Sequence, residues 1–412
     1  MSLAGLDSCR KKGFSMNTFA KSSINRSGDQ VKSIDKSRIS SIDILRGLVM
    51  LMMLVDHVRE RIYLHMQVSD PMNIETTSAD LFFTRLAAHL CAPVFVFLTG
   101  LSAWLYAHPS SGDLRSPSGF LFKRGLFIIA MEVTLINFSW MGEYHTLWLQ
   151  VMWAIGLSMI ALSVAVKLPM WLIATIGFVI VFGHDLLTPI TFLPGEAGYT
   201  LWTILHDRGY LIADGALKVK VSYPVLPWIG VILLGYFAGQ LYAKAVYSDV
   251  RISALIRLGI TCLALLLVLR GFNIYGETLP WQYGESVIQT IMSFFNYTKY
   301  GPSLNFLLLT LGIAFLLLAR FERADSESTA MRVLKTFGAA PMFFYIVHLY
   351  TLLLVYWVLM AIFGANQGDL YGVDQFYWVW VMSAAIACAL YFPTKSFAEF
   401  KKRSQRVWVR YL

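Results

Sequence analysis

Apolar stretches long enough to cross a lipid bilayer recur along the chain, and no other sequence feature constrains the fold as strongly. A membrane-spanning helix needs about 20 largely apolar residues, and this chain is 57% hydrophobic and only 14% charged. The predicted spans are 42–64, 80–107, 119–138, 146–167, 169–190, 224–246, 252–272, 300–320, 336–360 and 375–397. We therefore predict an all-α, polytopic membrane bundle of about ten helices.

Lysine and arginine are concentrated in alternate connections between these spans. Cytoplasmic loops collect basic residues, so this alternation predicts that both termini are cytoplasmic. It also accounts for the net charge of +9 without a nucleic-acid partner. The loops expected on the opposite side are richer in acidic, glycine, proline and tyrosine residues: 65–79, 139–145, 191–223, 273–299 and 361–374.

The membrane domain is expected over residues 41–398, between two basic cytoplasmic tails. Residues 1–40 lack the apolar core of a signal peptide and are predicted to be disordered, with Met16 as an alternative start. Residues 399–412 form the other tail, and 285–296 are predicted to be an amphipathic helix on the outer surface. The four cysteines lack metal-ligand spacing, so neither a metal site nor a disulfide is expected.

Before its charged exit at Arg59, the first span carries four ionisable side chains among apolar residues: Asp43, Arg46, Asp56 and His57. Arg46 and His57 are separated by about three turns and about 16 Å on one helical face, and Asp43 is within reach of Arg46. Charged groups are costly in lipid, so they face the bundle interior or a water-filled cavity. We therefore predict that this polar stripe points into the protein.

Two interpretations of the stripe remain open. Asp43 and Arg46 can form a structural ion pair near the cytoplasmic rim, or Arg46 can contact the donor. His57, polarised by Asp56 or Asp43, can act as a general base because the ordinary histidine pKa is suited to proton transfer. The alternative is an ordinary buried histidine that is hydrogen-bonded to a carbonyl.

Further polar side chains within predicted spans are expected to meet this stripe. Arg85 and His89 are one turn apart in the second span, and His348 lies near the middle of the ninth. We predict that they line one cavity between helices one, two and nine, with Lys299 at its outer mouth as a contact for the acceptor. Each of them alone can equally be a structural residue.

The stretch "SIDILRGLVMLMMLVDH" resembles the first helix of the transmembrane acyltransferase (acyltransferase-3) superfamily, in which ten residues separate an arginine from a histidine. The closer resemblance is to bacterial members of the heparan-α-glucosaminide N-acetyltransferase catalytic-domain family. The blocks that carry it are "D-x-x-RG" in the first helix, "APVFVFLTG" (92–100), "LQVMWAIGLSMIALS" (149–163), "LPWIGVILLGYFAG" (226–239), "TKYGPSLNFLLLTLG" (298–312) and "PMFFYIVHLY" (341–350).

This resemblance implies an enzyme of the bacterial inner membrane that moves an acyl group, typically acetyl from cytosolic acetyl-CoA, to a sugar-type acceptor across the membrane. The candidates for binding the CoA phosphates are basic residues expected on the cytoplasmic side: Lys123, Arg124, Arg251 and Arg257. In the lysosomal member of the family, asparagine occupies the position of His57 and the essential histidine follows the first helix. His65 is therefore the second candidate for the base.

Two other classes of protein remain as alternatives. A proton-coupled small-molecule transporter can use the same histidine, aspartate and arginine side chains as a proton relay, but no internal repeat is visible. A non-catalytic membrane scaffold does not need a polar interior. The identity of the acceptor, O- versus N-acylation, an acyl-histidine intermediate and the oligomeric state, a homodimer included, stay open.

Overall fold

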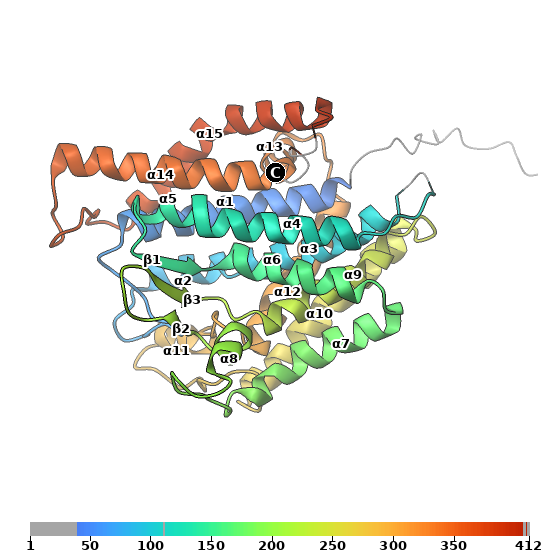
Figure 1. The fold of residues 1–412 in the computed structure, drawn as a ribbon, viewed down its shortest axis with the longest axis horizontal. Helices are drawn as coiled ribbons and strands as arrows, with labels where there is room; N and C mark the ends of the chain where they lie inside the picture. Colours follow the sequence, from blue (N-terminus) through green and yellow to red (C-terminus); the bar gives the residue numbers. More distant parts are fainter. Residues whose placement is uncertain (1–38, 110–111, 407–408, 410–412) are drawn as a thin grey trace, which may run out of the picture. The chain divides into compact units, whose positions relative to one another are not determined.

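The computed structural model describes residues 39–109, 112–406 and 409 (Figure 1). The predicted N-terminal tail therefore lies outside the described residues, apart from its last two. The helices of the first half are α1 (Ser40–Ile62), α2 (Ala79–Ala88), α3 (Cys91–Ala107), α4 (Ser118–Met131), α5 (Asn137–Met141), α6 (Val151–Ala165), α7 (Met170–Gly183) and α8 (Tyr199–Leu205). Those of the second half are α9 (Leu226–Ala238), α10 (Ser248–Gly271), α11 (Val287–Phe294), α12 (Leu304–Glu322), α13 (Thr329–Ala339), α14 (Pro341–Phe363) and α15 (Tyr377–Arg403).

Each predicted span overlaps at least one helix. Six helical segments are long and apolar enough to cross a membrane: Ala79–Ala107, Met170–Leu187, Ser248–Gly271, Leu304–Glu322, Pro341–Phe363 and Tyr377–Arg403. Two shorter apolar helices, Val151–Ala165 and Leu226–Tyr242, add to them. Helix α1 has sufficient length, but charged residues interrupt its apolar surface. The chain is thus a polytopic helical membrane protein, and the count of ten spans stays a prediction.

Several spans are less regular than the apolar pattern indicates. The second divides at His89–Leu90 into α2 and α3, and the third contains a π-helical turn, Glu132–Ile136, between α4 and α5. The ninth divides at Ala340, because Pro341 occupies the first turn of α14 and a proline cannot continue a preceding helix. The last helix continues to Arg403, into the range assigned to the C-terminal tail.

A small sheet corrects the all-α prediction. Strand β1 (Thr146–Leu149) pairs in parallel with β3 (Lys218–Val221), and β2 (Gly209–Ile212) pairs antiparallel to β3. The predicted helix at 146–167 therefore begins only at Val151. The apolar run "TLWL" is compatible with a helix or with a strand. Its strand partner lies far along the chain, so local periodicity cannot reveal the pairing.

Glycine pairs allow the helices around the site to approach closely. A Cβ on Gly47 of α1 would overlap the backbone of α13, and one on Gly338 of α13 would overlap the carbonyl of Asp43. Gly100 of α3 and Gly235 of α9 make a similar pair. Such small-residue contacts are typical of helix packing in membranes, where backbones must approach without a hydrophobic driving force. They fix α1 and α3, the two helices that carry most of the site.

The predicted amphipathic helix at 285–296 is present as α11. Met292 on one side of α11 is buried, whereas Val287 is 79% exposed. Its position relative to a membrane stays a prediction.

Candidate functional site

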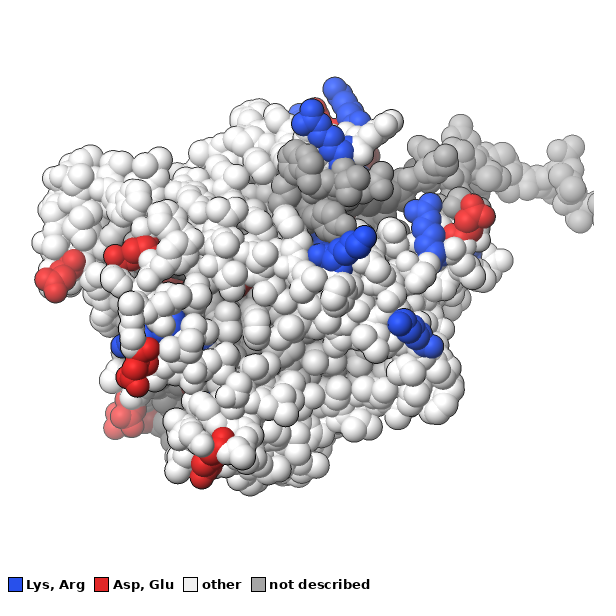
Figure 2. Space-filling model, in the orientation of Figure 1, with Lys and Arg blue, Asp and Glu red and all other residues white. Residues whose placement is uncertain are grey.

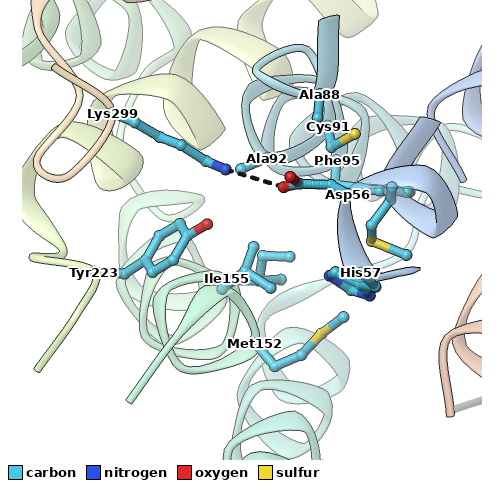
Figure 3. Close-up of a pocket in the computed structure, with 12 residues that line it drawn as sticks. Asp56, His57, Ala88, Cys91, Ala92, Phe95, Met152, Ile155, Tyr223 and Lys299 are labelled. Carbon is cyan, nitrogen blue, oxygen red and sulfur yellow. Dashed lines mark ion pairs between the residues drawn. The ribbon is translucent and has the colours of Figure 1, made fainter. Parts of the chain in front are cut away.

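A pocket that opens to solvent lies beside α1, with about 430 Å³ of empty space when the open solvent at its mouth is included (Figure 3). Its walls come from α1, from the α2–α3 junction, from the start of α6, and from two loop residues that precede α9 and α12. The lining residues are Met53, Asp56, His57, Ala88, Cys91, Ala92, Phe95, Val151, Met152, Ile155, Tyr223 and Lys299. Polar groups are therefore few and specific in a largely apolar cavity, which is the usual composition of a small-molecule site.

Asp56 is the buried carboxylate of this pocket, and two cations hold it. Arg59, one turn further along α1, donates from Nε to Oδ1 of Asp56 at 3.0 Å. The Nζ atom of Lys299 lies 3.6 Å from Oδ2 (Figure 3). Arg59 is shared with Glu60. A buried carboxylate needs such partners to stay ionised, and these contacts provide them.

His57 is hydrogen-bonded to a second histidine rather than to a carboxylate. Its Nδ1 lies 2.7 Å from Nε2 of His348, and Nδ1 of His348 lies 2.8 Å from the carbonyl oxygen of Phe344. The carbonyl can only accept, so a neutral His348 carries its proton on Nδ1 and accepts at Nε2. His57 then donates from Nδ1, and its Nε2 keeps the lone pair. This differs from the expectation that Asp56 or Asp43 polarises His57.

A network of hydrogen bonds positions Lys299 from outside the pocket. The carboxylate of Asp70 accepts from the backbone N–H groups of Lys299 (3.1 Å) and Tyr300 (2.9 Å). Glu277 accepts from the backbone N–H and the hydroxyl of Thr298. Arg270, fully buried at the end of α10, donates to carbonyl oxygens of residues 279, 293, 294 and 296. The loop that carries Lys299 is thus firmly held.

An apolar layer forms the part of the pocket nearest the start of α1. Met53 precedes His57 by one turn of α1, and Phe95 and Ile155 follow the first pocket residues of α3 and α6 by one turn. Because α3 and α6 run antiparallel to α1 (Figure 1), these three side chains lie on the same side of the polar groups. The site therefore has a polar half and an apolar half.

The other polar residues predicted for one cavity do not line this pocket. His348 is hydrogen-bonded to His57 and does not itself line the pocket. The predicted ion pair of Asp43 with Arg46 is present at 2.9 Å. Arg46 also donates to the Ser102 hydroxyl, and it lies three turns of α1 away from His57. These residues lie outside the lining of this pocket, and their predicted roles stay predictions.

Arg85 and His89 are buried in and just after α2 but also lie outside the lining. The His89 ring packs on Phe306 at a centroid distance of 5.1 Å. Within the described part of the chain, neither ring nitrogen of His89 nor Nε of Arg85 has a hydrogen-bond partner. His89 stands at the bend between α2 and α3, and its ring contacts α12 through Phe306.

His65, the second candidate for the base, lies in the loop after α1. Its ring packs against Tyr63 at a centroid distance of 4.7 Å, and it fills the space beside Gly372. It does not line the pocket. The structure thus brings His57, and not His65, to the polar groups of the cavity.

The four basic residues predicted to bind CoA phosphates differ in their surroundings. Arg251 forms an ion pair with Glu322 at 2.8 Å, and Glu322 also accepts from Ser41, so the guanidinium is already neutralised. Arg257 donates to the Ser253 carbonyl of its own helix and is exposed. Lys123 is exposed, and the Arg124 guanidinium lies over the Phe120 ring.

Sequence analysis missed Tyr223 and Cys91 as pocket residues. Tyr223 lies two residues after the end of β3 and outside every predicted span, and Cys91 begins α3 within an apolar run. Neither carries a charge that would be conspicuous in a membrane helix. The only sequence signal was that each residue lies close in the chain to a block that carries the family resemblance, 226–239 for Tyr223 and 92–100 for Cys91.

Comparison with known proteins agrees with this arrangement. No curated protein matches the chain. Residues 38–275, more than half of the chain, match the family described as heparan-alpha-glucosaminide N-acetyltransferase, catalytic. The matched range contains Asp56, His57 and Tyr223, whereas Lys299 and His348 lie beyond it. The chain therefore belongs to the heparan-alpha-glucosaminide N-acetyltransferase catalytic-domain family, whose name implies a membrane acetyltransferase acting on sugar acceptors.

Proposed function

We propose that this protein transfers an acetyl group from acetyl-CoA to a glucosamine-type sugar, with His57 as the general base. One observation carries the proposal: the hydrogen-bonded chain from Phe344 through His348 to His57 leaves the lone pair on Nε2 of a histidine that lines the pocket. A neutral imidazole in that tautomer accepts a proton without prior deprotonation. The chemistry matches the name of the family.

The reaction needs only one proton acceptor and one leaving group. As the neutral amine attacks the thioester carbonyl carbon, its nitrogen loses a proton to Nε2 of His57. The carbon–sulfur bond then breaks, and the CoA thiolate takes that proton from the imidazolium. The products are the N-acetylated sugar and free CoA, and His57 returns to its starting state. A hydroxyl acceptor would follow the same steps.

The two halves of the pocket suit the two substrates. The apolar layer of Met53, Phe95 and Ile155 can surround the acyl group and the uncharged pantetheine arm, which have few hydrogen-bonding groups near the thioester. The polar half offers Asp56 as a hydrogen-bond acceptor for the sugar's amine and hydroxyl groups. The position of Arg46 near the start of α1 supports a contact with the donor at the opposite end from Asp56.

The charge distribution supports delivery of the donor from the cytoplasmic side. Figure 2 shows that most Lys and Arg side chains on the visible face gather towards the end of the bundle where α1 begins, with most acidic side chains at the other end. The positive-inside rule assigns the basic end to the cytoplasm. The apolar half of the pocket lies on that side of His57. In a bacterial inner membrane that side faces the cytosol, which supplies acetyl-CoA.

The test is direct transfer by the purified protein in lipid nanodiscs. Acetyl-CoA labelled in its acetyl group is supplied with glucosamine, galactosamine or a neutral hexose, and labelled product is separated by chromatography. We expect label on the amino sugar with wild type and loss of transfer with His57→Ala. Protein that binds acetyl-CoA but labels none of these acceptors, or wild type and His57→Ala with equal rates, would contradict the proposal.

A further inference from the structure

Two hydrogen-bond donors face His57 from across the pocket. Figure 3 shows the Lys299 ammonium and the Tyr223 hydroxyl directed into the same space, with the His57 ring on the opposite wall. Both residues line the pocket and both are buried, at 5% and 8% exposure of the residue. Neither is needed for the proton transfer proposed for His57.

Independent parts of the chain hold the two donors in place. Asp70 fixes the backbone at Lys299. Tyr223 follows β3, and its backbone N–H donates to the Leu149 carbonyl at the end of β1. Its ring meets that of Tyr300 edge-on at a centroid distance of 4.8 Å. The small sheet and the loop before α12 therefore converge on one point, as a preorganised site requires.

Both donors of this wall keep their protons. Asp56 is contacted by two cations, Arg59 and Lys299. Burial by itself lowers the pKa of Lys299, but the neighbouring Tyr300 and Asp56 outweigh it and raise the pKa. Burial raises the pKa of Tyr223 well above its ordinary value. Lys299 therefore stays an ammonium and Tyr223 stays a hydroxyl, so both remain donors.

We propose that Tyr223 and Lys299 together bind the thioester carbonyl oxygen as it becomes an oxyanion. When the acceptor nitrogen bonds to the carbonyl carbon, the π electrons of the C=O bond move to that oxygen, and the proton lost by nitrogen goes to His57. The two donors stabilise the negative charge until the C=O bond re-forms and the CoA thiolate leaves. Fixed donors aimed at developing charge make one of the largest contributions to acyl-transfer catalysis. This assignment rests on the proposed function.

The alternative role for Lys299 is purely structural, as a counter-ion for Asp56. That role predicts lower stability in a Lys299 variant, but no selective loss of affinity for a molecule that carries an oxyanion. It leaves Tyr223 only a structural contact, the side-chain hydrogen bond with Tyr300, because the tyrosine is not paired with Asp56. The two roles therefore differ in what a Tyr223 variant does.

The experiment compares Tyr223→Phe, Lys299→Met and Lys299→Arg with two controls outside the pocket. The controls are Tyr283→Phe, an 85% exposed tyrosine, and Lys167→Met, an exposed lysine in the loop after α6. Steady-state kinetics give kcat and KM, with the acceptor sugar that the wild-type protein acetylates. Titration with CoA and with a trifluoromethyl ketone analogue of acetyl-CoA gives ground-state and oxyanion affinities. Water or the acceptor amine adds to the ketone carbon, the proton passes to His57, and the adduct carries a tetrahedral alkoxide.

We expect Tyr223→Phe and Lys299→Met each to lower kcat by about 10²- to 10³-fold, the usual effect of losing one such donor. KM and CoA affinity should change little, ketone affinity should fall together with kcat, and Lys299→Arg should recover part of both. The controls should behave as wild type. If Lys299→Met does not fold, Tyr223→Phe carries the test alone, since it removes only a hydroxyl.

Three outcomes would overturn this assignment while leaving the proposed function intact. They are an unchanged kcat in Tyr223→Phe, a rise in KM with kcat unchanged, and equal losses of affinity for CoA and the ketone. Lack of acetyl transfer by wild type is a different failure: it would overturn the proposed function and this assignment with it.

Discussion

The Nδ1 atom of His57 lies 2.7 Å from the Nε2 atom of His348, although 291 residues separate them in the chain. Because His348 in turn donates to the Phe344 carbonyl, the pair fixes which ring nitrogen of His57 carries the proton. The role resembles that of the aspartate in a catalytic triad, except that the orienting group is neutral. A neutral partner orients His57 but adds no charge to stabilise an imidazolium.

Replacing His348 by leucine should therefore slow transfer without abolishing it. The variant keeps most of the volume but removes the acceptor for Nδ1 of His57. A neutral hydrogen bond contributes about 1 kcal/mol, so we expect kcat to fall by roughly 5- to 10-fold, with KM for acetyl-CoA nearly unchanged. Steady-state kinetics in nanodiscs check this. A loss as large as that of His57→Ala would mean that His348 itself contacts a substrate.

The choice between two histidines for the base can be tested by a pair of alanine variants. His57→Ala should lower acetyl transfer by about 10²- to 10⁴-fold, the usual contribution of general-base catalysis, while acetyl-CoA binding persists. His65→Ala should keep nearly full activity, because its ring packs on Tyr63 outside the pocket. The reverse pattern would assign the base to the loop after α1, and full activity in both would remove the role from either residue.

Local patterns predicted the helices and one ion pair, because each depends on residues close in sequence. Asp43 and Arg46 are one turn apart, and their contact follows from helical spacing. The sheet could not be predicted this way: β1 pairs with a strand about 70 residues later. The break at His89 had a signal that was missed: Pro93, in the first turn of α3, cannot donate a hydrogen bond to the carbonyl of His89, four residues earlier.

The candidate site was predictable only for residues that are unusual where they stand. Asp56 and His57 are conspicuous because ionisable groups are costly in a membrane helix. Their partners follow from tertiary contacts: Lys299 meets Asp56, and His348 meets His57, across more than half of the chain. Tyr223 gives no comparable signal, because a tyrosine in a loop is ordinary.

Arg270 should be a major determinant of stability. Its buried guanidinium donates to four carbonyl groups of the loop that leads to Lys299. Hydrogen bonds to a charged group contribute about 1.5–3 kcal/mol each, and Arg270→Met leaves those carbonyls without their donor. We expect a large loss of thermal stability in detergent. Arg257→Met, an exposed arginine of the same helix, should change stability by less than about 0.5 kcal/mol, and equal effects would contradict this reading.

The close approach of α1 and α13 can be tested with one methyl group. A Cβ on Gly338 would overlap the Asp43 carbonyl oxygen, so Gly338→Ala should push the helices apart and cost about 1–3 kcal/mol. Gly119, in the first turn of α4, has no atom near its added Cβ, and Gly119→Ala is the matched control. Thermal unfolding in detergent measures both. Wild-type stability of Gly338→Ala would show that the two helices are not in tight contact.

The orientation in the membrane decides which substrate enters from which side. The distribution of Lys and Arg predicts that the C-terminus is cytoplasmic and that 273–299, the loop anchored by Arg270, faces the opposite side. Alkaline phosphatase is active only outside the cytoplasm and green fluorescent protein folds well only inside it, so paired fusions report each site. A fusion after Leu412 should give fluorescence without phosphatase activity, and insertions near Tyr283, an 85% exposed position, should give the reverse. If both sites report the opposite side, the apolar half of the pocket would face away from cytosolic acetyl-CoA, and the proposed direction of transfer would be wrong even if His57 is the base.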